Sequence, residues 1–437
     1  MANFSDTIYA LSSGSLPAGI AVVRISGPAA ETILKRLTGK AVEPRIARLL
    51  VLRDEQGEVL DQALTLFFPE GMSFTGEAVV ELHLHGGKAV LRAVLDAIAA
   101  FPNTRLAEAG EFTRRAFING RMDLTAAEGV ADLISAETDA QRRFALSNAV
   151  GDQERLYSGW REQLIEARAL IEADLDFSDE GDVPGSVADA VLEQVHALRV
   201  VVEEHLSQTR RGEILRDGFR IAIVGEPNVG KSSLLNAIAR RDVAIVSYEA
   251  GTTRDLIEVA LDLGGYKVIL IDTAGLRETD NIVERLGIER ARTAAHQADL
   301  VLHLHVAGTE NPSKLDVPVQ TLSVATKADL LPDGVPADSV ALSTMTGDGL
   351  SDLLVEIEHR VTEAASGMSL LLPSRERHVQ HLRQTHLALE RSQRTHLPLE
   401  LLAEELRIAA DHLGHITGAI GVDDLLDVIF TRFCIGK

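Results

Sequence analysis

The chain has 437 residues, a length that corresponds to roughly two to four domains. Hydrophobic residues make up 46% of it and charged residues 25%, which excludes a disordered chain. The formal net charge of −22 argues against broad, non-specific nucleic-acid binding, although it leaves room for a local basic patch. With no long apolar run, no signal-like start and a single cysteine, Cys434, the sequence predicts a cytoplasmic protein without a membrane span or a disulfide framework.

Residues 1–120 have the pattern of a small α+β domain. The apolar run at 20–25 predicts a strand, and short helical patterns accompany it. Residues 80–85 alternate between apolar and polar side chains and are followed by Gly86-Gly87, which predicts a half-buried strand that ends at a turn.

Residues 121–215 and 373–437 have helical periodicity instead. Apolar side chains recur at steps of three or four in three stripes: Leu156, Trp160, Leu164, Ala167 and Ile171; Leu192, Val195, Leu198, Val202 and Leu206; Leu402, Leu406, Ala409, Leu413 and Ile416. A loop is expected at 178–185, which is rich in helix-breaking residues. We interpret the stripes as core packing of one helical domain, which residues 216–372 interrupt.

Residues 216–372 alternate between strand and helix patterns. Strands are expected at 220–224, 267–271, 300–306 and 320–325, with a helix beginning at Lys231. This alternation predicts an α/β domain with a parallel sheet wrapped by helices.

A phosphate-binding loop is the clearest motif in this inserted domain. Residues 225–232 read GEPNVGKS and match G-x-x-x-x-G-K-[ST] between a predicted strand and helix. Backbone N–H groups of such a loop surround phosphate oxygens, Lys231 reaches the β and γ phosphates, and the Ser232 hydroxyl ligates Mg²⁺. The segment assigned to GTP comprises Gly225, Asn228, Val229, Gly230, Lys231, Ser232 and Ser233.

Further segments follow in the order expected of a GTPase. The loop GTTRD at 251–255 offers a threonine hydroxyl to Mg²⁺, and DTAG at 272–275 ends a strand beside the γ-phosphate. In TKAD at 326–329, the carboxylate of Asp329 can accept two hydrogen bonds from guanine, which adenine cannot offer. Ser343 and Thr344 fit either a backbone wall of the base pocket or a plain turn. The residues added to the GTP site are Ser247, Thr252, Thr253, Asp272, Thr273, Ala274, Gly275, Thr326, Lys327, Asp329, Ser343 and Thr344.

Hydrolysis needs a device other than the usual glutamine. Leu276 follows the DTAG segment, and leucine cannot orient water. We expect Asn228 to bring a monovalent cation to the phosphates and Glu284 to orient the water, with Lys231 completing the catalytic set. From spacing alone, Glu284 is also compatible with a solvated helix position.

Segments outside the inserted domain resemble those of one family. They are DTI at 6–8, VRISG at 23–27, GEFTRRAF at 110–117, DLLDVIF at 424–430 and FCIGK at 433–437. Together with the GTPase motifs, they make the whole chain similar to the MnmE (TrmE) family of tRNA-modifying GTPases. The resemblance implies a homodimer that binds 5-formyltetrahydrofolate or a related folate through its N-terminal domain. It also implies a heterotetramer with an MnmG-type flavoprotein that modifies the tRNA wobble uridine at C5, with K⁺-dependent pairing of the GTPase domains.

The same resemblance assigns individual residues. It implies folate contacts for Arg24, Glu81, Arg121 and Lys437, K⁺ ligands at Asn228, Ser247, Glu249 and Thr252, Mg²⁺ ligands at Ser232 and Thr253, and water orientation by Glu284. Several positions depart from the family pattern: Arg121 stands in place of a frequent lysine, Thr326 replaces the asparagine of the guanine motif, and Ser247 and Glu249 also differ.

Other interpretations stay open at this stage. Arg24 and Glu81 fit halves of structural ion pairs as well as folate ligands, and Cys434 fits an apolar filler as well as a nucleophile. The chain as a whole is also compatible with an RNA- or ribosome-associated assembly switch, or with a regulatory GTPase whose folate pocket is vestigial.

Overall fold

The computed structural model describes residues 5–176, 187–241, 243–245, 257–272, 293–309, 318–330, 338–367, 369–421, 426, 429–431, 433 and 436. The chain divides into two compact units. One comprises Met1–Ala131, Gln153–Gln163 and Ala410–Lys437, and the other comprises Asp132–Asp152 and Leu164–Ala409. None of the helices in the described part of the chain combines the length and apolar character that crossing a bilayer requires.

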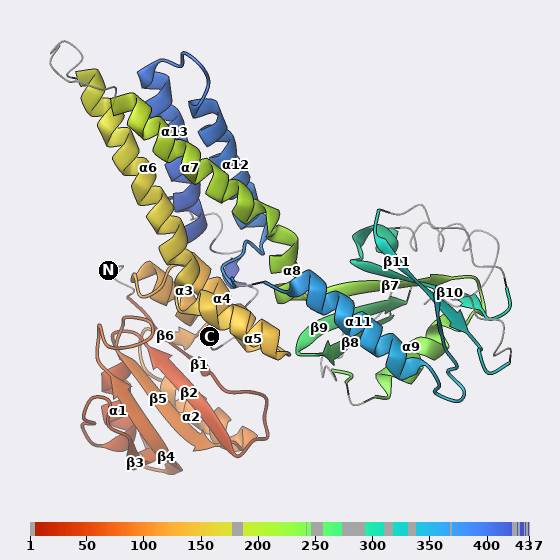
Figure 1. Cartoon of the computed structure of the whole chain (residues 1–437). Coiled ribbons are helices and arrows are strands. Elements are labelled where there is room, and N and C mark those ends of the chain that lie inside the picture. Colours follow the sequence, from red (N-terminus) through yellow and green to blue (C-terminus); the bar gives the residue numbers. More distant parts are fainter. Residues whose placement is uncertain are drawn as a thin grey trace, which may run out of the picture. The chain divides into compact units, whose positions relative to one another are not determined.

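The first unit contains a six-stranded mixed sheet in the order β3-β4-β5-β2-β1-β6 (Figure 1). Its strands are β1 (Thr7–Leu11), β2 (Ile20–Ser26), β3 (Arg48–Arg53), β4 (Val59–Phe68), β5 (Val79–His85) and β6 (Thr104–Leu106). Helices α1 (Ala30–Thr38) and α2 (Lys88–Ala99) cover one face, where Ile33, Leu34, Val94 and Ile98 pack on buried strand residues. The predicted α+β fold is confirmed, and each predicted strand extends by one residue.

Two short helices follow β6, and the first of them packs on the other face of this sheet. They are α3 (Glu111–Ile118) and α4 (Leu124–Ser135), which continues into the second unit. Phe112 of α3 is fully buried against Ile8 and Ala10 of β1. Leu426, Phe430 and Phe433 from the C-terminal segment pack on Leu124 and Ala127 of α4. Residues from the two ends of the sequence therefore share one fold unit.

The second unit contains most of the long helices. They are α5 (Asp139–Ala149), α6 (Asp152–Asp176), α7 (Val187–Ser207), α8 (Thr209–Asp217), α12 (Glu376–Ser392) and α13 (Leu399–Thr417), of which α6 and α13 run through both units. The predicted stripes are buried along most of their length, with Leu156, Leu192 and Leu206 half-buried. The loop expected at 178–185 lies outside the described residues.

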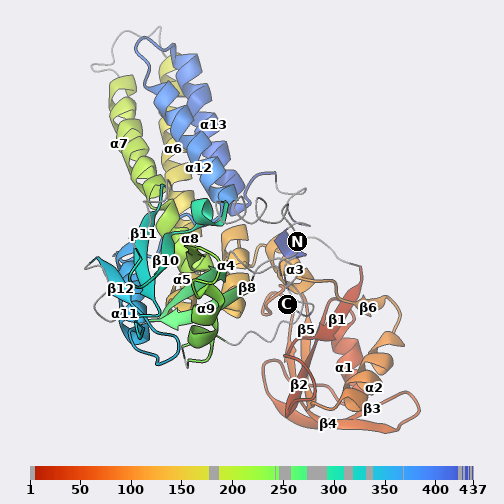
Figure 2. The same cartoon turned by 90° about the vertical axis from the view of Figure 1, so that its right-hand side faces the viewer.

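The α/β domain of the second unit has a six-stranded sheet in the order β12-β11-β10-β7-β9-β8 (Figure 2). Its strands are β7 (Phe219–Gly225), β8 (Ile257–Leu263), β9 (Tyr266–Asp272), β10 (Leu300–Val306), β11 (Gln320–Thr326) and β12 (Ser339–Ala341). The predicted parallel sheet is confirmed for β12, β11, β10, β7 and β9, whereas the edge strand β8 runs antiparallel to β9. Strands β8 and β12 were not predicted from the sequence.

Helices cover both faces of this sheet. Side chains of α9 (Lys231–Ala239) and α11 (Leu350–Ala365) share one core cluster with the strands. Ala295 and Ala298, in and beside the helical residues 293–297, pack on Ala222 and Val301. The carboxyl ends of β7, β9, β10 and β11 form the edge at which an α/β fold binds its ligand.

Candidate functional site

The phosphate-loop segment joins β7 directly to α9. Gly230 has φ of 108° and Asn228 has φ of 62°, so the chain passes through left-handed conformations that a side chain normally disfavours. A Cβ at Gly225 would lie 2.5 Å from the Leu304 carbonyl oxygen of β10, so the loop can leave the sheet this closely only with glycine. The geometry is that of a loop whose N–H groups precede a helix N-terminus, as anion binding requires.

Lys231 and Ser232 are held at the first turn of α9. Lys231 is 9% exposed, and its Nζ donates to the carbonyl oxygens of Gly225 at 2.8 Å and Glu226 at 2.9 Å. Burial lowers the pKa of this ammonium group, and Asp272 opposes the change. The Ser232 hydroxyl donates to Asp272 Oδ2 at 2.9 Å, and Asp272 is fully buried. A hydroxyl beside a carboxylate is an oxygen donor set that suits Mg²⁺.

The residues predicted to hold the base come together at the ends of β11 and β12. Thr326 ends β11, and the Thr326 hydroxyl lies 2.7 Å from the Val229 carbonyl oxygen of the phosphate loop. Lys327, at φ of 57°, donates from Nζ to the Asn228 carbonyl oxygen at 3.1 Å. The Ala328 N–H donates to the Leu342 carbonyl oxygen, which brings the loop of exposed Asp329 beside Ser343.

Ser343 and Thr344 lie in a hydrogen-bonded turn. Ser343 is 1% exposed, its N–H donates to the Asp348 carbonyl oxygen, and its hydroxyl accepts from the Thr346 N–H. The turn directly follows Leu342, whose carbonyl oxygen accepts the hydrogen bond from the Ala328 N–H. Both readings of this segment are therefore compatible, since it is a turn and it borders the predicted base site.

Several predicted site residues lie outside the described part of the chain. They are Ser247, Glu249, Thr252, Thr253, Thr273, Ala274, Gly275, Glu284 and Lys437, together with Leu276 and Cys434. Their assignments to GTP, the metal ions, water orientation and folate stay predictions.

Arg24 and Glu81 lie opposite each other on β2 and β5 of the first unit. Arg24 Nη2 donates to Glu81 Oε1 at 2.9 Å, so the two side chains form an ion pair with each other. The Arg24 guanidinium also lies 5.6 Å from the ring centroid of Phe74 and 5.7 Å from that of Phe112, within cation–π range. The pair is about one-fifth exposed, so a ligand can still reach it.

Arg121, another predicted folate residue, and Gly436, which precedes the predicted folate residue Lys437, lie near parts of the same sheet. The exposed side chain of Arg121 lies against Gly76, two residues from Phe74; a Cβ at Gly76 would be 3.2 Å from Arg121 Cγ. The Ser12 hydroxyl, one residue beyond β1, donates to the Gly436 carbonyl oxygen at 2.7 Å. The penultimate residue is thus tied to the strand that pairs with β2.

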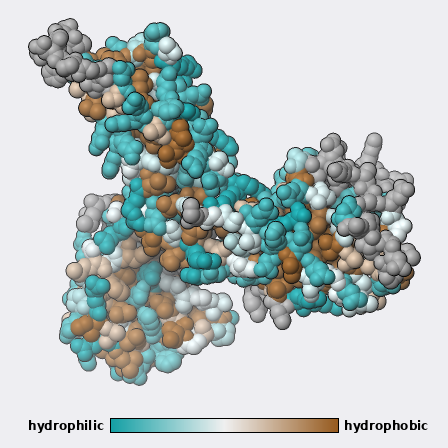
Figure 3. Space-filling model, in the orientation of Figure 1, coloured by the Kyte–Doolittle hydropathy of each residue, from teal (hydrophilic) through white to brown (hydrophobic). Residues whose placement is uncertain are grey.

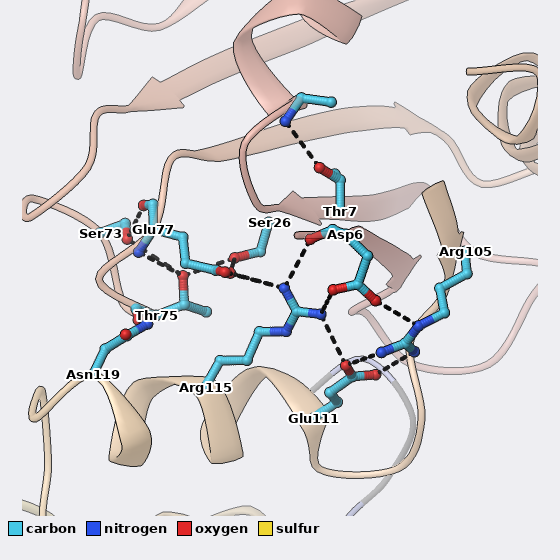
Figure 4. Close-up of polar contacts among 11 residues, drawn as sticks. Asp6, Thr7, Ser26, Ser73, Thr75, Glu77, Arg105, Glu111, Arg115 and Asn119 are labelled. Atoms are coloured by element: carbon cyan, nitrogen blue, oxygen red, sulfur yellow. Dashed lines mark hydrogen bonds and ion pairs between the residues drawn. The ribbon is translucent and has the colours of Figure 1, made fainter. Parts of the chain in front are cut away.

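A buried polar network surrounds Arg115 and was missed by the sequence analysis (Figure 4). Arg115, 1% exposed, donates to Asp6, Glu77 and Glu111. Arg105 bridges Asp6 and Glu111 from the far side. Burial works to raise the pKa of Asp6 and Glu111, but the two guanidinium groups outweigh it and hold both pKa values below the ordinary range. The network ties α3, and with it Phe112, to β1 and to the loop before β5.

Residues 7–121 match the family described as "GTP-binding protein TrmE N-terminus", and residues 124–434 match the "MnmE helical domain" family. The curated "tRNA modification GTPase MnmE" of Brucella ovis is 52% identical over 437 residues, which cover 100% of this chain and 99% of that protein. The protein of the same description from Rhizobium meliloti is 53% identical over 441 residues and 99% of each chain. The fold and the phosphate loop define a P-loop GTPase with additional α+β and helical parts. This chain belongs to the MnmE (TrmE) family.

Substituting Asp329 tests its assignment to the guanine base. Asp329→Asn is expected to weaken GDP binding by about tenfold or more and to improve xanthosine diphosphate binding, because an amide can donate to the xanthine 2-oxo group. Equilibrium titration with both nucleotides measures the change. Asp352→Asn, at the exposed start of α11, is the control and should leave both affinities as they are. Unchanged selectivity in Asp329→Asn would remove this residue from the base site.

Removal of Arg115 should destabilise the first unit. Arg115→Met leaves three carboxylates without their shared partner, at a cost of about 3–5 kcal/mol. Hydrogen exchange of the β1 and β2 amides in the full chain measures this cost. Because the pKa values of Asp6 and Glu111 are lowered on folding, their contribution is present above the ordinary carboxyl range and lost as pH falls through the folded values. The difference from wild type should therefore shrink in acid.

Arg92→Met is the matched control, because the Arg92 side chain is 85% exposed in its contact with Asp96. It should change the stability by less than about 0.5 kcal/mol. A loss of protection in Arg115→Met no larger than in this control would show that the network contributes no net stability.

Proposed function

We propose that this protein is a K⁺-activated GTPase that acts with an MnmG-type flavoprotein to modify the tRNA wobble uridine at C5. The one-carbon unit would come from a formyl-tetrahydrofolate. The observation that carries the proposal is the phosphate loop at 225–232, held between β7 and α9 in a chain whose remaining parts match the MnmE family.

The GTPase half of the proposal uses the chain's own groups at the phosphate loop. The N–H groups of the loop and of the first turn of α9 would donate hydrogen bonds to phosphate oxygens, and Lys231 is placed to move from loop carbonyls to phosphate oxygens. Ser232 and Asp272 would hold Mg²⁺, which neutralises phosphate charge when bound. GTP turnover would drive movement of the GTPase domains rather than chemistry on the base.

K⁺ activation rests on Asn228. Its side chain is exposed, and its backbone is fixed by the left-handed φ and by the contact from Lys327. An amide oxygen is a suitable ligand for an alkali cation, and such a cation would supply the charge that an arginine finger supplies in other GTPases. Ser247, Glu249 and Thr252 remain the proposed further ligands, Thr253 the second Mg²⁺ ligand and Glu284 the group that orients water.

The folate half of the proposal rests on Arg24, Glu81 and Arg121, with Lys437 following the anchored Gly436. Phe74 and Phe112 add apolar surface beside the ion pair, which suits a ring system that carries polar edges. Because an ionised carboxylate can only accept hydrogen bonds, Glu81 would bind N–H groups of the ligand, while Arg24 and Arg121 would bind acceptor atoms.

Homodimerisation is supported by exposed apolar side chains on the face of the first sheet opposite α1 and α2. Leu49 pairs with Leu64 on this face, and the two residues are 61% and 38% exposed. Val51, two residues along β3, is 37% exposed on the same face. Figure 3 shows apolar surface over this domain. Apolar patches of this kind are commonly covered by a second subunit.

The tRNA and the flavoprotein partner enter the proposal together. A chain with a net charge of −22 is poorly suited to bind the negatively charged RNA backbone without a partner protein. The proposed heterotetramer would place the tRNA mainly on the partner's surface and leave this chain to supply GTP turnover and the one-carbon unit.

Potassium dependence tests the GTPase mechanism. GTP turnover in K⁺ is expected to exceed turnover in Na⁺ by at least about tenfold, and its specific rate should rise with protein concentration as GTPase domains pair. Asn228→Ala should remove the K⁺ effect. Asn236→Ala, on α9, is the control and should retain it. Equal rates in the two salts, at every protein concentration, would contradict the mechanism.

Arg24→Ala separates the modifying activity from the GTPase. We expect it to weaken 5-formyltetrahydrofolate binding by about tenfold or more, because a charged contact is lost, and to leave K⁺-dependent GTP turnover as it is. Introduced into a strain that lacks this protein, it should fail to restore C5 modification of the wobble uridine. Arg92→Ala is the control. Undiminished folate affinity would remove Arg24 from the site, and normal modification in the deletion strain would favour an assembly switch.

A further inference from the structure

Thr326 ties the phosphate loop to the neighbouring strands. It is 3% exposed at the end of β11, and the Thr326 hydroxyl oxygen lies 2.7 Å from the Val229 carbonyl oxygen and 3.0 Å from the His305 carbonyl oxygen. Val229 belongs to the loop, and His305 belongs to β10. The hydroxyl therefore connects three segments that converge at the nucleotide site.

Both partners of this hydroxyl are acceptors. A carbonyl oxygen has no hydrogen to donate, and a threonine hydroxyl has only one. The single Thr326 hydrogen is thus shared between two acceptors of the protein, and the hydroxyl has only lone pairs left to offer. A guanine base presents N7 and O6 as acceptors, which require donors. Thr326 can therefore hold the loop, but it has no hydrogen left for the base.

Neighbouring donors are also engaged within the protein. The Ala328 N–H donates to the Leu342 carbonyl oxygen, and the Ser343 N–H donates to the Asp348 carbonyl oxygen. Lys327 donates from Nζ to the loop at Asn228. The exposed carboxylate of Asp329 accepts hydrogen bonds and is suited to the N1–H and the exocyclic amine of guanine, on the edge opposite N7.

From this arrangement we infer that the pocket selects guanine through Asp329 and leaves N7 unread, with Thr326 as a positioning residue for the phosphate loop. The inference rests on the proposed GTP site. It differs from what an asparagine at this position would give, because a side-chain amide has two N–H hydrogens. One could replace the contact with Val229, and the other would stay available for N7.

Affinities for GDP and 7-deaza-GDP, which has a C–H in place of N7, test the inference on the full chain. Wild type should bind the two nucleotides with affinities within about twofold of each other. Thr326→Asn should prefer GDP by about tenfold, the worth of one hydrogen bond. Thr326→Ala should lower the affinities for both nucleotides by a similar factor, because the loop loses its hydrogen bond to residue 326. Thr326→Ser, which keeps the hydroxyl, should have affinities for both nucleotides close to those of wild type.

A tenfold preference of wild type for GDP over 7-deaza-GDP would overturn the inference, whether Thr326→Ala abolishes the preference or retains it. In the first case Thr326 itself reads the base, and in the second another donor does. If Thr326→Ala does not fold, wild type and Thr326→Ser decide the matter alone. No binding of GDP by wild type would instead contradict the proposed GTPase function. Binding of GDP with an unexpected nucleotide ratio overturns only the inference.

Discussion

The phosphate loop depends on backbone conformations that the chain adopts only under constraint. Asn228 and Lys327 are not glycine, yet both have left-handed φ values, of 62° and 57°. Such conformations persist where the surroundings over-determine them. Here Lys231 Nζ binds two loop carbonyls, Lys327 Nζ binds a third, and the Thr326 hydroxyl lies against a fourth. The ends of β7, β10 and β11 are therefore joined through the loop that the nucleotide is expected to occupy.

Most of the correct predictions came from local sequence patterns. The strand of residues 300–306 and the helix beginning at Lys231 were found at their observed starts, because periodicity and the phosphate-loop motif are contiguous signals. The antiparallel β8 was missed, although Gly264-Gly265 between two alternating runs is a hairpin signal. The alternation of strands and helices in the domain favoured a parallel sheet, and a single edge strand does not alter that average pattern.

Sites assembled from segments that are distant in the sequence were harder to predict. Arg115 and Asp6 are 109 positions apart, and no spacing rule relates them. The motif around Arg115 supported a family resemblance, but its role in a buried network follows only from the fold. Arg24 and Glu81 are an intermediate case: each lies on a predicted strand, yet the register that places them opposite each other could not be read from either strand alone.

Thr326 stands where the family resemblance leads us to expect asparagine, and its contacts show which part of the motif the fold constrains. Residue 326 is buried between two carbonyl oxygens, so an apolar side chain would leave both without this donor. A threonine hydroxyl supplies this donor and occupies less volume than an asparagine amide. The carboxylate at 329 lies at the exposed end of the same turn, where a ligand can reach it. In the proposed site, the structural tie and the recognition of the base thus reside in different residues of one four-residue segment. The residue that forms the tie can change its chemistry while the residue that binds the base keeps its own.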